Sequence, residues 1–215
     1  MLTVHHLRQS QSERVVWLCE ELGLDYDLKL YDRREDNRLA PDDYKALTPM
    51  GTAPVITDGD LALGESGAII DYITGKYGAG NLVPDSGDPD YAQHCFWYHW
   101  SNGTFMATMM MQLMLTMSGA PEGMAHAFVK DRADKGWRLI EARLGEADFF
   151  GGRRLTTADI MMVYALTTAR AFRGMELGGD FPNLTAYLQR ISAREAYQRA
   201  MAEAEPGMDP NIPKA

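Results

Sequence analysis

The stretch Thr52-Ala-Pro-Val-Ile-Thr-Asp-Gly-Asp-Leu-Ala-Leu-Gly-Glu-Ser-Gly-Ala-Ile69 decides the fold of this chain. Two short apolar runs, 54–57 and 61–64, flank an Asp-Gly dipeptide at 58–59. This pattern is a strong hairpin signal, because a tight turn between strands needs residues that tolerate positive φ. Apolar residues then recur at helical spacing over 66–77. The stretch therefore predicts two antiparallel strands followed by a helix.

The residues before this stretch predict a strand, a helix and a second strand. Residues 2–7 suit a short strand, and residues 25–31 alternate polar and apolar side chains as a half-buried strand does. Between them, apolar residues recur on one helical face that Gly23 closes, namely Val15, Leu18, Cys19 and Leu22. The charged segment 32–50 predicts a surface excursion with at most a short helix. Because a βαβ unit makes its two strands parallel, residues 1–80 predict a βαβ–ββα domain.

The rest of the chain lacks strand alternation and predicts helices only. Residues 81–90 have the Pro-, Gly- and Asp-rich composition of a linker. Helical periodicity follows over 91–117, 122–144, 156–171 and 184–204, with a break near 192 and a Pro-rich, non-helical tail after 205. The predicted fold is thus an α/β domain over 1–80 joined by a linker to an all-helical domain over 91–215.

Composition limits the classes of partner. With 215 residues and 46% hydrophobic content, the chain can bury the cores of two domains. The net charge of −9 argues against nucleic acid and anionic membranes, since both are bound through Lys and Arg. There is no signal peptide and no apolar run of membrane-spanning length, which predicts a cytoplasmic protein. Neither the two cysteines nor the five histidines show a metal-binding spacing, so no metal is expected.

Three motifs together resemble the glutathione S-transferase family over nearly the whole chain: Thr52-Ala-Pro-Val55, Glu65-Ser-Gly-Ala-Ile69 and Leu155-Thr-Thr-Ala-Asp-Ile160. The segments around His5-His6 and Ser12–Gly23 are most similar to bacterial and fungal members that lack the tyrosine of the animal classes. The resemblance implies a homodimer with a thioredoxin-like N-terminal domain that holds glutathione as co-substrate. It also implies that the helical domain completes a pocket for a small hydrophobic electrophile.

The resemblance implies two parts of a glutathione site. A cis Pro54, with Thr52 and Ala53 before it, would present backbone groups to the cysteinyl part of glutathione as an added strand; the alternative is an ordinary turn proline. Ser66 and the free amides of its helix would bind the γ-glutamyl carboxylate, and Glu65 would accept from the ammonium group. A structural alternative explains Ser66 as a plain helix N-cap.

The loop 8–14 is where the resemblance places the chemistry. Serine-type transferases carry a serine four residues before an arginine, and Ser10 precedes Arg14 by that spacing, so these two residues are the catalytic candidates. The loop contains neither tyrosine nor cysteine, which favours the serine type. The competing interpretation is structural, because Ser10-x-x-Glu13 also fits a capping box and Ser12 could be the true N-cap.

Two features of the helical domain complete the expectations. Thr156-x-x-Asp159 fits a capping box and predicts a structural role at a helix start. Met106, Met110 and Leu113 share one helical stripe and are the candidate contacts for an apolar electrophile, against the alternative of core or dimer packing. Asn102 lies where family members often have an acidic residue that reaches glutathione in the other subunit.

The expected function is transfer of the glutathione thiolate to an apolar electrophile. The first alternative keeps the fold and uses glutathione to reduce peroxides or to remove a halide. The second is a non-catalytic, transferase-like protein that binds a ligand or a partner. Residues suited to bind glutathione weigh against the second alternative, because a pure scaffold does not need them.

Overall fold

The N-terminal domain contains a four-stranded mixed sheet, which the computed structural model shows in the order β2-β1-β3-β4. The model describes residues 1–119, 121–171, 176–177, 179–208 and 212. Strand β1 (Leu2–Leu7) pairs in parallel with β2 (Asp27–Tyr31) and antiparallel with β3 (Val55–Asp58), and β3 pairs with β4 (Leu61–Gly64). Gly59, at φ +60°, makes the turn between β3 and β4. The predicted βαβ–ββα order is confirmed.

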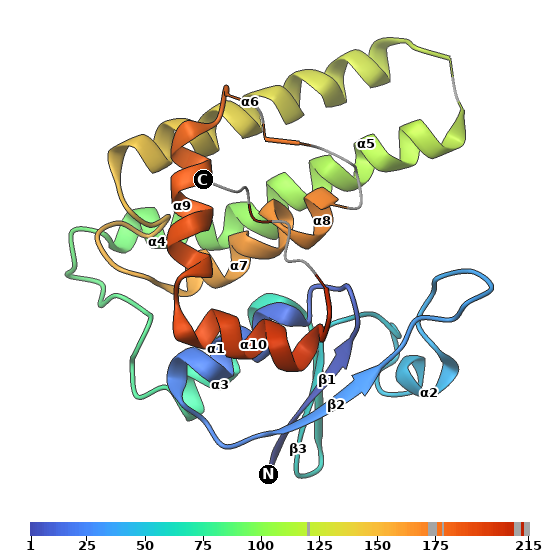
Figure 1. The fold of residues 1–215 in the computed structure, drawn as a ribbon, viewed down its shortest axis with the longest axis vertical. Coiled ribbons are helices and arrows are strands. Elements are labelled where there is room, and N and C mark those ends of the chain that lie inside the picture. The colour runs from blue at the N-terminus through green and yellow to red at the C-terminus, as the bar shows by residue number, and fades with distance from the viewer. Residues whose placement is uncertain (120, 172–175, 178, 209–211, 213–215) are drawn as a thin grey trace.

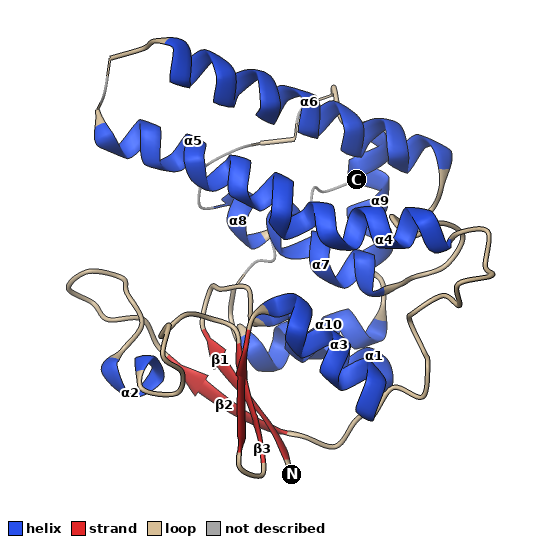
Figure 2. Cartoon of the chain, turned by 180° about the vertical axis from the view of Figure 1, so that it is seen from behind, coloured by secondary structure: helices blue, strands red, loops and turns tan. Residues whose placement is uncertain are grey.

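Helices cover both faces of this sheet (Figure 2). Helices α1 (Glu13–Leu22) and α3 (Ser66–Lys76) pack on the face that carries Val4 and Ile56. The short helix α2 (Asp42–Lys45) lies on the other side, where Tyr44 packs against Tyr31 and Val55. Adjacent residues of β3 thus point to opposite faces, as the alternation of a strand requires.

The second domain consists of helices, as predicted. Its elements are α4 (Tyr91–Trp100), the π-helical segment η1 (Ser101–Met106), α5 (Ala107–Ser118), α6 (Met124–Glu146), α7 (Thr157–Leu166), α8 (Thr168–Ala171), α9 (Pro182–Ser192) and α10 (Glu195–Ala204). Helices α5 and α6 form a long antiparallel pair, and α7 lies buried beneath them (Figure 1). The predicted helix over 91–117 is wrong in one respect, because η1 interrupts it. The predicted break near 192 is confirmed, whereas 209–211 and 213–215 of the predicted tail lie outside the described residues.

The predicted capping box at the start of α7 is present. The Asp159 carboxylate accepts from the Thr156 backbone N–H at 2.9 Å, and the Thr156 hydroxyl accepts from the Ala158 N–H at 3.3 Å. Asp159 also accepts from the Phe150 N–H at 2.9 Å. These bonds satisfy the free donors at the helix start and join it to the preceding loop, which supports a structural role.

Helix α10 leaves the helical domain and packs on α1 of the N-terminal domain (Figure 1). Arg194 donates to both carboxylate oxygens of Glu21, at 2.6 and 2.7 Å, and Tyr197 packs edge-on against Trp17. The residues just after α10 therefore lie against the loop that follows β1. Among the described residues, no helix is long and apolar enough to cross a membrane.

Candidate functional site

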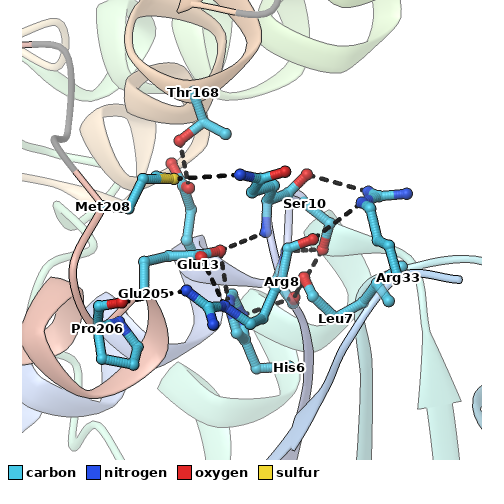
Figure 3. Close-up of polar contacts among 12 residues, drawn as sticks. His6, Leu7, Arg8, Ser10, Glu13, Arg33, Thr168, Glu205, Pro206 and Met208 are labelled. Atoms are coloured by element: carbon cyan, nitrogen blue, oxygen red, sulfur yellow. Dashed lines mark hydrogen bonds and ion pairs between the residues drawn. The ribbon is translucent and has the colours of Figure 1, made fainter. Parts of the chain in front are cut away.

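The loop between β1 and α1 is fixed from two sides. Gln9 has φ +57°, a left-handed conformation that typically costs a non-glycine residue about 1–3 kcal/mol. In this conformation its backbone N–H donates to the Glu205 carboxylate, and its carbonyl accepts from Arg33 Nη2 at 3.0 Å. Arg33 also donates to the Arg8 carbonyl at 2.9 Å. Figure 3 shows this loop held between the segment after α10 and the end of β2.

Ser10 lies in this loop with its hydroxyl directed into a hydrogen-bonded cluster. Its Oγ is 2.7 Å from the Oγ of Ser12 and accepts from the Ser12 backbone N–H at 3.2 Å. The capping-box interpretation of Ser10 and Glu13 is wrong, because the Glu13 carboxylate accepts from the Thr168 hydroxyl at 2.6 Å instead of turning back to the loop. Ser12 occupies the N-cap position of α1, but its side chain makes no capping bond.

The cluster continues from Ser12 into the protein interior. The Ser12 hydroxyl is 2.8 Å from Nδ1 of His6, and Nε2 of His6 is 3.0 Å from the Glu205 carboxylate. Burial by itself would raise the pKa of Glu205, but hydrogen bonds from His6, the Gln9 N–H and Arg8 outweigh it and lower this pKa below its ordinary value. Glu205 is therefore a buried carboxylate anion that faces His6 (Figure 3).

Arg14 points away from Ser10, toward the start of α3. Its Nη1 donates to Gln11, to Ser66 Oγ at 3.2 Å and to Asn102 Oδ1 at 3.0 Å. Burial lowers the pKa of Arg14 to about 10, which leaves the guanidinium charged at neutral pH. The two catalytic candidates thus direct their side chains into different clusters, and Arg14 lies with the residues predicted to bind the γ-glutamyl group.

Ser66 is the first residue of α3, and its hydroxyl makes no capping bond. The interpretation of Ser66 as a plain N-cap is therefore wrong; its hydroxyl accepts from Arg14 and lies 3.5 Å from the Gln11 side-chain carbonyl as a donor. Glu65, in the N-cap position, has φ +72° and an exposed side chain. A carboxylate acceptor and the positive end of α3 thus lie side by side at the surface.

The Ala53–Pro54 peptide bond is cis, as predicted. Pro54 is buried directly before β3, whereas Ala53 is half-buried and Thr52 is exposed. Val55, the next residue, pairs with His5 of β1 and Gly64 of β4. The segment therefore lies between the end of β4, which leads to Glu65, and the end of β1, which leads to Ser10.

Glu13 lies at the contact between the two domains and is 4% exposed. Its carboxylate accepts from the hydroxyls of Thr168 and Thr167, at 2.6 and 3.4 Å. Burial raises the pKa of Glu13 to about 7. The charge of Glu205 adds to this increase, whereas Arg14 and the two threonine hydroxyls oppose it.

The three candidate electrophile contacts lie in different surroundings. Met110 is 50% exposed and lines an apolar groove of about 510 Å³ between α5 and α6, together with Met114, Phe128 and Val129. Met106 and Leu113 are half-buried, and Met106 packs against the main core. Their role in substrate binding stays a prediction. Among the described residues, no group of three or more His, Cys, Asp or Glu side chains could hold a metal ion.

Sequence reasoning missed His6, Gln11 and Glu205. His6 belongs to the His5-His6 segment of the family resemblance, but no local pattern distinguishes its buried ring from that of a core histidine. Glu205 meets His6 across 199 positions of sequence, so only the fold brings them together. Asn102 occupies the position at which family members often carry an acidic residue, and its side chain accepts from Arg14.

The glutathione S-transferase N-terminal domain model matches residues 10–75, and the C-terminal domain model matches residues 105–195. Glutathione S-transferase 3 of Schizosaccharomyces pombe is 27% identical over 95% of this chain and 88% of its own length. GstB of Escherichia coli K12 is 27% identical over 88% of this chain and 91% of its own length. A glutathione S-transferase structure from Actinobacillus pleuropneumoniae is 33% identical, covers 97% of this chain and 95% of that one, and has a TM-score of 0.86. The chain therefore belongs to the glutathione S-transferase family.

Proposed function

We propose that this chain binds glutathione across the N-terminal ends of α1 and α3 and activates its thiol at Ser10. The observation that carries the proposal is the hydroxyl of Ser66, which is free of any capping role and bonded instead to the buried cation Arg14. The γ-glutamyl carboxylate binds the amides at the start of α3, where the helix dipole favours an anion, and the hydroxyl of Ser66, which is 1% exposed, holds Arg14 beside them. Glu65 accepts from the ammonium group of the same moiety.

The cysteinyl part of glutathione pairs in extended form with the backbone of Thr52, Ala53 and Pro54, which adds a short strand beside β3. In this orientation the γ-glutamyl end of glutathione lies near Glu65 and the cysteinyl thiol lies near Ser10. A relative from Xanthomonas axonopodis, 24% identical with a TM-score of 0.68, was solved with glutathione bound and supports the fold as one that accommodates this ligand.

The chemical task of the site is to ionise the thiol. A cysteine thiol has a pKa of about 8.5, and the thiolate is the nucleophile. Lowering that pKa by about one to two units requires only about 1.4–2.8 kcal/mol of preferential stabilisation of the anion. A hydrogen bond from the Ser10 hydroxyl, together with the positive end of α1, supplies an energy of this order. The thiolate then forms a carbon–sulfur bond with the electrophile, and the leaving group departs with its bonding electrons.

The electrophile is an apolar molecule held against η1 and α5, with Met106 nearest to Arg14 and Asn102 and with Leu113 and Met110 further along, Met110 at the edge of the groove that it shares with Met114 and Phe128. Asn102 supports this assignment, because it belongs to η1 and accepts from Arg14 at 3.0 Å, and Met106 lies one turn further along the chain. Flexible thioether side chains adapt to varied apolar shapes, which suits a permissive site.

The proposal includes a homodimer formed through α5 and α6. These helices expose large apolar side chains, among them Met111 at 42%, Met114 at 48% and Phe128 at 57%. Contiguous exposed apolar patches of this kind are typical of protein interfaces. We place the protein in the cytoplasm, where Cys19 and Cys95, both free, stay reduced.

The test combines binding with turnover. Glutathione should raise the thermal stability of the wild-type protein, because a ligand that binds only the folded state stabilises that state. The wild-type protein should also conjugate glutathione to a generic aryl halide. Ser10→Ala should retain the stabilisation but lose most of the turnover, whereas Ser192→Ala, a matched change at the end of α9, should retain both. Equal turnover of Ser10→Ala and wild type would reject the serine assignment. If glutathione stabilises the protein but only peroxide or organohalide substrates react, the alternative chemistry is correct.

A further inference from the structure

A continuous chain of hydrogen bonds leads from Ser10 into the interior and ends on a carboxylate. The Oγ atoms of Ser10 and Ser12 are 2.7 Å apart, Ser12 Oγ is 2.8 Å from His6 Nδ1, and His6 Nε2 is 3.0 Å from Glu205 Oε1. The four residues come from the β1–α1 loop, from β1 and from the segment after α10. We call them the Ser10–Glu205 relay.

Ser10 is the most exposed of the four relay residues. His6 and Ser12 are 0% exposed and Glu205 is 1% exposed, whereas Ser10 is 4% exposed. Ser12, His6 and Glu205 are arranged like a hydrolase triad, but Ser12 cannot touch a ligand because it has no exposed surface. Only Ser10 can meet the glutathione thiol, and the other three members act through it.

The direction of the hydrogen bonds depends on the protonation of His6. The Glu205 carboxylate can only accept, so Nε2 of His6 carries a proton. In a neutral imidazole Nδ1 is then an acceptor, so the Ser12 hydroxyl donates to it at 2.8 Å, with the Leu7 carbonyl as a longer second acceptor at 3.3 Å, and accepts in turn from the Ser10 hydroxyl. Because Ser10 Oγ also accepts from the Ser12 N–H, one lone pair of Ser10 is left to face a thiol S–H.

We propose that His6, oriented by Glu205, takes up the glutathione thiol proton through Ser10 and Ser12. The S–H bond breaks, a proton moves one step along each hydroxyl, and an N–H bond forms at Nδ1 of His6. No electrons are transferred between centres, so a neutral thiol and a neutral imidazole become a thiolate and an imidazolium. Positioned hydroxyls that pass a proton to a histidine base are an established form of general base catalysis.

The transfer reverses the hydrogen bonds between Ser10 and Ser12 and between Ser12 and His6, whereas Nε2 of His6 donates to Glu205 both before and after it. An imidazolium donates from both nitrogens, so Nδ1–H donates to Ser12 and the Ser12 hydroxyl donates to Ser10. Ser10 then directs its own proton toward the sulfur anion. The same serine thus accepts from the thiol and afterwards stabilises the thiolate. When the leaving group has departed, His6 returns its proton to that group or to water by the same path.

Several charged groups lie around the His6 ring. Glu205 contacts the ring directly, and the buried Glu13 carboxyl interacts electrostatically with Glu205. Two cations also face Glu205: Arg8, with Nε at 3.3 Å, and Arg33, at the back of the loop. Because Glu205 is the only charged group in direct contact with the ring among the described residues, an imidazolium forms a buried ion pair there.

The inference rests on the proposed function, so the experiment measures glutathione binding and turnover as well as ionisation of the bound thiol. The pKa of bound glutathione is read from thiolate absorbance against pH, the dissociation constant from calorimetry, and kcat/KM with an aryl halide across the same pH range. The variants are Ser10→Ala, which removes the hydroxyl nearest to the thiol, Ser12→Ala, which interrupts the relay, Ser12→Thr, which restores a hydroxyl, and Glu205→Gln. The controls are Ser192→Ala, and Glu21→Gln, which weakens the contact of α10 with α1 without touching His6.

Ser12→Ala should raise the pKa of the bound thiol by about one unit or more and lower kcat/KM at neutral pH about tenfold. Activity should recover at alkaline pH, glutathione affinity should change less than about twofold, and Ser12→Thr should restore the wild-type profile. Glu205→Gln should act in the same direction as Ser12→Ala, and both controls should match wild type. If Ser10→Ala raises the thiol pKa but Ser12→Ala and Glu205→Gln do not, the relay is refuted and the proposed function stands. If wild-type protein does not bind glutathione, the proposed function fails and the relay fails with it.

Discussion

Glu13→Gln should make the protein more stable relative to wild type as the pH rises. Glu13 is buried between the domains, and burial raises its pKa from 4.5 to about 7. The folded state therefore binds the Glu13 proton more tightly than the unfolded state does. The contribution of protonated Glu13 to the free energy of unfolding is complete below pH 4.5 and is lost as the pH rises through 7. Between pH 4 and pH 8 the loss amounts to about 3 kcal/mol, because each pKa unit corresponds to about 1.4 kcal/mol.

Glutamine keeps a neutral carbonyl acceptor for the Thr168 hydroxyl and has no proton to lose. The free energy of unfolding of each protein is measured with urea at half-unit pH intervals. The value for Glu13→Gln minus the value for wild type should rise by about 3 kcal/mol from pH 4 to pH 8. The control is Glu195→Gln, whose side chain is 92% exposed, and its difference from wild type should not change with pH. In a Glu205→Gln background the increase should be smaller, since the charge of Glu205 contributes to the raised pKa of Glu13. A Glu13→Gln difference that is flat across this range would refute the reasoning.

Three further changes test other parts of the structure. Arg14→Met removes the donors to Gln11, Ser66 and Asn102 and should weaken glutathione binding at least about tenfold by calorimetry; unchanged affinity would remove Arg14 from the site. Thr156→Ala breaks the capping box and should lower the free energy of unfolding by about 0.5–2 kcal/mol, with KM for glutathione unchanged, and a selective loss of catalysis would contradict its structural role. Phe128→Asp should convert a dimer to a monomer by analytical ultracentrifugation, and a wild-type protein that sediments as a monomer would contradict the proposed interface.

Local sequence signals were sufficient for the sheet and most helices, because their causes are local. The hairpin depends on the Asp-Gly turn, and α1 ends where Gly23 adopts φ +61°. The π-helical segment η1 could not be predicted from periodicity. It depends on contacts of its own residues with distant ones, such as the bond from Ser101 Oγ to the Met161 carbonyl at 2.7 Å.

Two segments fit the capping-box pattern in sequence, but only one of them forms a capping box in the structure. Thr156-x-x-Asp159 forms a capping box because Thr156 has the extended conformation of an N-cap, φ −136° and ψ 174°, immediately before α7. Ser10-x-x-Glu13 does not, because α1 begins only at Glu13 and the intervening Ser12 already has helical φ and ψ. The Glu13 carboxylate is instead bound by threonines more than 150 positions away, a contact that only the fold provides.

The inferred activation of the thiol depends partly on residues outside the segments that define the family. The two domain models match 10–75 and 105–195, so Ser10, Arg14 and Ser66 lie within the matched ranges, whereas His6 and Glu205 lie outside both. Glu205 also holds the Gln9 N–H, which fixes the left-handed turn just before Ser10. The segment after α10 therefore sets both the shape of the loop and the charge behind its histidine. A change in that segment can alter how the thiol is ionised while the residues that define the family stay the same.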